Sequence, residues 1–239
     1  AMIVRRFGMT GLKPGHVTVR LRGSAGQSLG AFAVQGLKLE VLGDANDYVG
    51  KGLSGGTIVV RPLPSSTLAT NENTIVGNTV LYGATAGKLF AAGQAAERFA
   101  VRNSGAETVV EGCGSNGCEY MTAGTAVLLG RVGENFAAGM TGGMAFVYDE
   151  DDWFPRAVNT ETVIYQRLAS GHWEQRLRAL IEEHVAETQS RFAAQLLNDW
   201  KLERARFWQI VPKEMVARLD YPLDDRLPDD MRAAAQPAE

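Results

Sequence analysis

Short apolar runs recur along the first two thirds of the chain, and small residues stand directly before each of them. Gly105, Gly124 and Gly143 precede three such runs, and both steps between these glycines are 19 residues long. A repeat near twenty residues is typical of a solenoid, in which one coil cannot bury its own apolar face and stacks on its neighbours. Valine and leucine are frequent in the runs, which favours buried strands. We therefore predict a stack of short parallel strands.

An aliphatic residue follows each anchor glycine at the fourth position, and we expect these residues to form a column inside the stack. The anchor glycines are expected to be structural, because a sharply turning chain needs positive φ angles that glycine adopts without strain. The predicted column contains Val60, Leu81, Val109, Leu128 and Val147. The predicted structural glycines are Gly56, Gly105, Gly124 and Gly143.

The repeat also indicates how the chain is organised. About six coils fit between residues 36 and 149, and we expect an inserted loop at 61–73 where the spacing is irregular. Residues 1–35 are expected to lead into the solenoid and to include a strand with alternating apolar residues at 16–22. Their abrupt start suggests a piece of a longer polypeptide.

Glycine almost vanishes after residue 149, and the apolar residues change to helical spacing. One amphipathic helix is predicted around 173–185 and a second after a possible N-cap at Ser190, followed by a short strand at 207–215. We expect residues 150–220 to form a helical tail on the end of the solenoid, where it covers unpaired strand edges. Residues 221–239 are expected to be a disordered end. The predicted class is all-β: a single-stranded parallel β-helix with a C-terminal helical tail.

Composition narrows the classes of function. The chain has 24 basic and 27 acidic residues and a net charge of −3, which argues against a nucleic-acid partner. No stretch approaches the roughly 20 apolar residues of a membrane span, and no secretory signal is visible at the start. Two cysteines are too few for a disulfide scaffold. We therefore expect a cytoplasmic protein without membrane contact.

Two glycine-rich loops, at residues 23–30 and 50–56, invite comparison with phosphate-binding loops. A dinucleotide motif needs a helix after the glycines, so that the phosphate meets a helix N-terminus. Here a strand follows the second loop, and we favour glycine at tight corners over nucleotide binding. The acidic run at 149–152 is most simply a solvated end of the coil, with Ca²⁺ binding as the alternative.

Other candidate side chains give little support for catalysis. Cys113 and Cys118 form a C-x4-C pair, which supplies only half of a typical zinc or iron–sulfur ligand set. We favour small buried thiols in a corner over half of a metal site shared with another domain. His184 is expected to pack a helix, and Glu111 and Glu119 have no predictable separation for acid–base work. We predict no catalytic, cofactor-binding or metal-binding residue in this chain.

Four long strings of the chain are informative together: GSAGQSLGAF at 23–32, GDANDYVGKGLSGG at 43–56, VVEGCGSNGCEYMTAG at 109–124 and GRVGENFAAGMTGGMAFVYD at 130–149. In this order they closely resemble the C-terminal GXGXG domain of the glutamate synthase large (alpha) subunit, most closely that of the bacterial NADPH-dependent type. The resemblance covers nearly the whole chain apart from about the last fifteen residues, and it includes the predicted helices.

This resemblance implies a right-handed parallel β-helix that holds other domains in place and has no catalytic residue of its own. The partners it implies are the amidotransferase, central and FMN-binding synthase domains of the same polypeptide, and the small subunit. The cofactors it implies lie elsewhere in the full enzyme: FMN and a 3Fe-4S cluster in the large subunit, and FAD, a 4Fe-4S cluster and NADPH in the small subunit. The whole enzyme makes L-glutamate from L-glutamine and 2-oxoglutarate, and ammonia passes internally between its sites.

Two alternatives remain open at the level of sequence. Related glycine-rich coils resemble a subunit of formylmethanofuran dehydrogenase, a redox assembly, although the helical tail favours the synthase family. The isolated chain could also form a homodimer through an exposed strand edge or through surface that its missing partners would cover.

Overall fold

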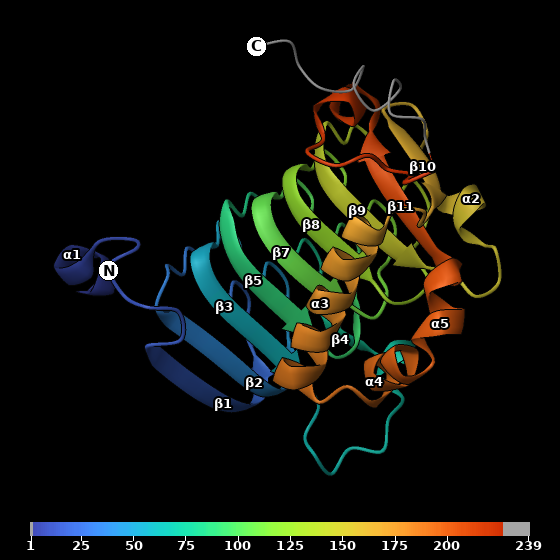
Figure 1. Cartoon of the computed structure of the whole chain (residues 1–239). Helices are drawn as coiled ribbons and strands as arrows, with labels where there is room; N and C mark the ends of the chain where they lie inside the picture. The colour runs from blue at the N-terminus through green and yellow to red at the C-terminus, as the bar shows by residue number, and fades with distance from the viewer. Residues whose placement is uncertain (1, 227–239) are drawn as a thin grey trace.

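Parallel strands stacked in register form the body of the molecule in a computed structural model that describes residues 2–226. Seven strands follow one another up the stack, each roughly one coil further along the chain (Figure 1). They are β1 (Val17–Ala25), β2 (Leu37–Ala45), β3 (Ser54–Arg61), β5 (Ala86–Ala91), β7 (Ser104–Val110), β8 (Thr122–Leu128) and β9 (Gly142–Tyr148). The short strands β4 (Thr74–Val76) and β6 (Gln94–Ala95) form a second line of parallel pairing. The predicted parallel solenoid is confirmed, with about seven coils.

An aliphatic column runs through the interior, as predicted, but two of its members differ. Strand pairing aligns Leu21, Val41, Val60, Ala91, Val110, Leu128 and Val147. Val60, Leu128 and Val147 are confirmed as members of this column. Leu81 is buried but lies in a turn outside the strands.

Val109 was assigned to the wrong face of its strand. A β-bulge near Gly105 changes the offset between β7 and β8 from 19 residues at Ser104 to 18 at Glu107. Since side chains alternate along a strand, one extra residue turns every later side chain to the opposite face. Val110 therefore takes the interior position, and Val109 packs outward beneath the C-terminal helices.

The inserted loop lies where the spacing predicted it. Thr57 pairs with Lys88, an offset of 31 residues in place of about 19, and residues 62–69 together with the 3-10 helix η1 (Thr70–Glu72) account for the excess. The stack itself begins earlier than the predicted boundary at residue 36, because β1 pairs with β2 over its whole length. Before β1 lies the short helix α1 (Met2–Phe7), which stands away from the stack in Figure 1.

Helices of the C-terminal region cover the outer face of the sheet. The long helix α3 (Gly171–Thr188) crosses β3, β5 and β7, and α4 (Arg191–Asn198) and α5 (Trp200–Glu203) follow it (Figure 1). These helices bury a second apolar cluster against the sheet, separate from the cluster inside the coils. The predicted N-cap is confirmed, since the Ser190 hydroxyl accepts the Ala193 N–H at 3.1 Å.

A strand, in place of the expected helix, covers the last edge of the stack. The strand β11 (Phe207–Pro212) pairs antiparallel with β9, and β10 (Val163–Arg167) pairs with β11. A paired strand satisfies the N–H and C=O groups along an edge, which a helix packed beside it cannot do. The remaining short elements are α2 (Phe154–Ala157), η2 (Arg204–Arg206) and η3 (Lys213–Arg218). The expected disordered end falls mostly at 227–239, outside the described residues.

Across residues 2–226, no helix combines the length and the apolar character that crossing a bilayer would require.

Candidate functional site

The four predicted structural glycines lie near the beginnings of β3, β7, β8 and β9, on one side of the stack. Gly124 illustrates why glycine is needed, because its φ is +91° and an added Cβ would lie 2.3 Å from the Ala106 carbonyl oxygen. Gly105 and Gly143 also have positive φ angles. Gly56 does not; the close approach of Ala33 limits its space, and the neighbouring Gly55 has the positive φ. A positive φ angle therefore explains the glycine at three of the four positions.

Six successive coils also contain a corner with three left-handed residues at alternate positions, and we call this set the corner ladder. Its three columns have φ angles between 53° and 68° in each of the six corners. The first column is Ser28, Tyr48, Thr79, Arg98, Asn116 and Asn135; the middle column is Gly30, Gly50, Leu81, Ala100, Cys118 and Ala137; the third is Phe32, Gly52, Gly83, Arg102, Tyr120 and Gly139. Most members carry a side chain, although a left-handed conformation costs such a residue about 1–2 kcal/mol.

Hydrogen bonds between coils offset this strain. Most N–H groups of the first and third columns donate to the following coil, as Ser28 does to the Asp47 carbonyl at 2.8 Å. In the middle column they donate to the preceding coil, as Cys118 does to Phe99 at 2.7 Å. Because the bonds run in both directions, each corner holds the two neighbouring corners in register. This ladder was not predicted from the sequence, although the alternation of Gly50 and Gly52 was a usable signal for it.

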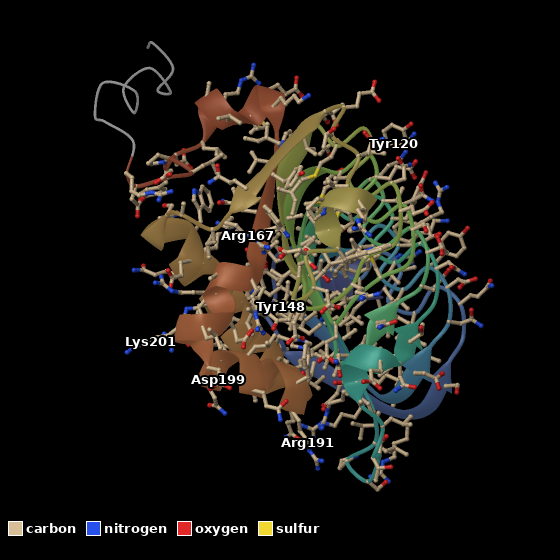
Figure 2. The ribbon with its side chains drawn as sticks, turned by 90° about the vertical axis from the view of Figure 1, so that its right-hand side faces the viewer. Tyr120, Tyr148, Arg167, Arg191, Asp199 and Lys201 are labelled. Atoms are coloured by element: carbon tan, nitrogen blue, oxygen red, sulfur yellow. The ribbon has the colours of Figure 1, made fainter. Side chains whose placement is uncertain are left out.

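Side chains of the third column lie on the surface, and aromatic rings cover some of its glycines. The Phe32 ring lies over Gly52, and the Tyr120 ring over Gly139. Both aromatic side chains are more than half exposed, and Arg102 lies 5.8 Å from the Tyr120 ring centre. Figure 2 shows Tyr120 projecting from the solenoid away from the C-terminal helices. Exposed aromatic and arginine side chains are common in protein–protein interfaces.

The two glycine-rich loops considered for phosphate binding belong to the corner ladder. Two N–H groups of the loop 50–56 are used within the fold, since Gly50 donates to Leu29 and Gly52 to Tyr82. A phosphate cradle needs N–H groups that point at the ligand. Gly50 and Gly52 therefore do not offer their N–H groups to a phosphate.

Both cysteines are free, buried thiols, as the favoured interpretation proposed. Cys118 occupies the middle column of the corner ladder, and Cys113 forms a β-bridge with Ala95 on one side and Val132 on the other. Burial raises the pKa of Cys113 well above its usual value, and it raises the pKa of Cys118 as well. Within residues 2–226, no group of three potential metal ligands comes together.

A buried polar cluster, formed by Glu111, His184, Thr188 and Ser190, fixes the helices to the solenoid. Glu111 follows β7 directly, and its carboxylate accepts the Ser190 hydroxyl. His184 Nε2 lies 3.3 Å from the same carboxylate oxygen, and the Thr188 hydroxyl donates to the His184 carbonyl. Glu111 and His184 are 0% exposed, which fits the predicted packing role of His184. The other oxygen of Glu111 and Nδ1 of His184 have no hydrogen-bond partner among the described residues.

The remaining histidines and Glu119 do not join this cluster. His172 stacks on Tyr221 with ring centres 3.5 Å apart, near the surface, and His16 lies in the exposed turn before β1. Glu119 is close to Arg98, at 3.5 Å. Glu111 and Glu119 thus have different partners, and the structure does not pair them.

Ion pairs attach α3 to the edge of the sheet that carries the glycines. Lys88 Nζ lies 2.6 Å from Glu183 and 3.5 Å from Glu107, and Lys38 pairs with Glu187. Burial lowers the pKa of Lys88, but the hydrogen bond and charge of Glu183 outweigh it and raise that pKa above its usual value. These pairs line a groove of about 860 Å³ between α3 and the strands.

A second polar group joins β9 to the end of the helical region. The Tyr148 hydroxyl donates to Glu203 at 2.5 Å and accepts from Arg206 at 3.1 Å, and Arg206 also pairs with Glu150. Burial, and then the hydrogen bond with Glu203, raise the pKa of Tyr148 to about 12. Figure 2 places Tyr148 between the solenoid and the helices.

The acidic run at 149–152 is not simply solvated. Asp149 is buried and accepts N–H groups of Trp153 and Phe154 at 2.9 Å, which caps α2. Asp151 pairs with Arg131 at 2.8 Å, and Asp152 pairs with Arg167. These carboxylates therefore have protein partners that explain their positions.

Comparison with known proteins agrees with this geometry. A family described as "GXGXG motif" matches residues 1–213, and its alternating glycines match the spacing of left-handed residues in each corner. The NADPH glutamate synthase large chain of Azospirillum brasilense is 75% identical over 93% of this chain, which covers 15% of that relative.

More distant relatives are synthases as well. The ferredoxin-dependent glutamate synthase 1 of Arabidopsis thaliana is 51% identical over 88% of this chain and 13% of its own length. The NADPH glutamate synthase large chain of Bacillus subtilis is 46% identical over 91% of this chain and 15% of its own length. The chain thus spans about one seventh of the length of these curated relatives. It belongs to the GXGXG family and corresponds to the GXGXG domain of glutamate synthase large chains.

Proposed function

We propose that this chain is a non-catalytic scaffold domain of a glutamate synthase large subunit, and that it holds the catalytic domains of that subunit at fixed distances. The observation that carries the proposal is the 75% identity to one part of a large chain. The whole enzyme would convert L-glutamine, 2-oxoglutarate and NADPH to L-glutamate. Since each relative described above is a glutamate synthase, this family is favoured over formylmethanofuran dehydrogenase.

A scaffold role suits the physical character of the fold. Hydrogen bonds link every coil to the next at the strands and again at the corner ladder. The most prominent polar cluster, around Glu111, is buried, so a substrate could not reach it without unfolding. An enzyme that passes ammonia between two sites needs domains at constant separation, and a rigid solenoid would supply this.

Cofactors and partners follow from the same proposal. FMN and the 3Fe-4S cluster would be held by other domains of the large subunit, and FAD, the 4Fe-4S cluster and NADPH by the small subunit. The amidotransferase, central and synthase domains would be the direct partners, in the cytoplasm. The surface column with Phe32 and Tyr120 would contact one of them, because it combines exposed aromatic and cationic side chains.

Assays on the isolated chain test whether it is catalytic. We expect the purified chain to fold with a β-rich circular dichroism spectrum, to release no ammonia from glutamine and to form no glutamate from glutamine and 2-oxoglutarate. Glutamine hydrolysis that copurifies with the folded chain at constant specific activity would overturn the proposal.

A further inference from the structure

The first strand of the solenoid leaves one end of the stack open. β1 pairs with β2 on one side, and no strand among residues 2–226 pairs with its other side (Figure 1). The interior column is correspondingly uncovered there: Leu21 is 37% exposed, whereas its neighbour Val41 is 0% exposed. Val17 and Val19, on the same face, are similarly exposed. The opposite end of the stack differs, because β11 covers β9.

On the open side of β1, backbone N–H and C=O groups point outward without a strand among residues 2–226 to pair with. The Val17 N–H donates to the Gly36 carbonyl at 2.8 Å, so Val17 is directed at the following coil. In a parallel ladder, one residue directs both its N–H and its C=O group to the strand on one side, and the next residue directs both groups to the other side. Thr18, Arg20 and Arg22 therefore present their N–H and C=O groups outward. Such a row is a template for pairing with another strand.

Charge at this end differs from that of the whole chain. Residues 1–39 contain six basic residues and no acidic one, although the net charge of the chain is −3. On the sheet face that carries Arg20, charges alternate from strand to strand: Arg61 on β3 pairs with Glu40 on β2 at 3.2 Å, and Glu40 pairs with Arg20 on β1 at 2.8 Å. The Arg20 side chain remains 76% exposed. A next strand that continued the alternation would carry an acidic residue there.

We propose that the open edge of β1 binds a β-strand of a neighbouring domain of the same large subunit, with apolar side chains toward the solenoid interior and acidic side chains beside Arg20 and Arg22. This inference rests on the proposed function. About six sevenths of the length of the relatives lies outside the matched region, and such a strand would belong to that part. A second copy of this chain fits less well. Two β1 edges would bring Arg20 and Arg22 of one copy against the same arginines of the other, and like charges across strands are destabilising.

A peptide about six residues long, with alternating valine and glutamate, provides the probe. The measurements are fluorescence anisotropy of the labelled peptide with the whole chain, and hydrogen exchange of the β1 amides at neutral pH. We expect the glutamate peptide to bind and to protect Thr18, Arg20 and Arg22 more than Val19 and Leu21. A peptide with lysine in place of glutamate should bind at least about tenfold more weakly.

A variant locates the site independently. Arg22→Glu changes an exposed side chain with no hydrogen-bonded partner among the described residues, and it should weaken binding of the glutamate peptide by about tenfold. The matched control is Lys201→Glu on α5, which makes the same change of charge far from β1, as Figures 1 and 2 together show, and should leave binding unchanged. Circular dichroism verifies that both variants fold.

Several results would overturn the proposal: no binding of the glutamate peptide, equal binding of the lysine peptide, or equal effects of Arg22→Glu and Lys201→Glu. A dimer in light scattering, with β1 amides protected in the absence of peptide, would assign the edge to a second copy. None of these results bears on whether the chain hydrolyses glutamine, so failure of this inference is distinguishable from failure of the scaffold role.

Discussion

Gly124 lies where one coil passes close to the preceding coil. Replacing it with alanine should lower the free energy of unfolding by about 3 kcal/mol, because a side chain at φ +91° is strained and its Cβ would meet the Ala106 carbonyl oxygen at 2.3 Å. Urea denaturation measures the change. The control is Gly26→Ala, since an added Cβ there meets nothing within 4 Å, and it should change stability by less than about 0.5 kcal/mol. Equal stability of the two variants would contradict this account of the corner.

Sequence reasoning at this scale succeeded where residue type determines conformation. Glycine before an apolar run identified Gly105, Gly124 and Gly143, all of which have positive φ angles. It failed where other residue types adopt the same conformation, as Leu81 and Cys118 do in the corner ladder. Bonds between coils impose those angles, and the coils must be aligned before such bonds can be inferred. The burial of the two cysteines was predictable, but the place of Cys118 in the corner ladder was not.

Ser190 has two roles at the junction of α3 and α4. Its hydroxyl caps α4 and donates to the buried Glu111 carboxylate. Ser190→Ala should therefore lower the free energy of unfolding by about 2–3 kcal/mol. Two losses add up to this value: α4 loses its N-cap, and the buried Glu111 carboxylate loses a hydrogen-bond donor. Thermal or urea denaturation measures this loss. Ser65→Ala, in the exposed loop after β3, is the control and should be nearly neutral. A loss no larger than that of the control would mean that the cluster does not secure the helices.

Tyr148 makes the packing of the helical end sensitive to alkaline pH. Its pKa is raised from 10 to about 12 in the folded state, so the unfolded chain releases this proton first. The stabilisation is fully present below pH 10 and is lost as the pH rises toward 12. We expect the slope of unfolding free energy against pH in this window to be steeper for the wild type than for Tyr148→Phe. Parallel slopes for the two proteins would show that Tyr148 titrates normally.

Helices, strands and loops were predicted correctly where the spacing of apolar residues follows a single period. The helix around 173–185, the N-cap at Ser190 and the insertion after β3 all follow from local spacing. The error at Val109 has a local cause, since a bulge of one residue leaves the repeat length almost unchanged yet inverts the face. The strand β11 on the edge of β9 depends on pairing between segments about sixty residues apart, which periodicity does not encode.

At the scale of the molecule, the two ends of the solenoid differ in whether a further strand covers them. The C-terminal end is closed by β11 and β10, and the helices add a second apolar cluster on the outer face. The N-terminal end is open, basic and apolar at β1. A body that is closed at one end and prepared for pairing at the other is suited to a fixed place within a larger protein. The family supports this interpretation, since the chain matches only about one seventh of its relatives' length.

The most direct test of the scaffold role is the ratio of glutamate formed to glutamine hydrolysed by a large subunit with and without this domain, assayed with its small subunit. We expect removal of the domain to leave measurable glutamine hydrolysis while the ratio falls and free ammonia appears, because the catalytic domains lose their fixed separation. The intact subunit with Gly26→Ala, in which the solenoid is unperturbed, should keep the full ratio. An unchanged ratio in a folded, active subunit that lacks this domain would contradict the account.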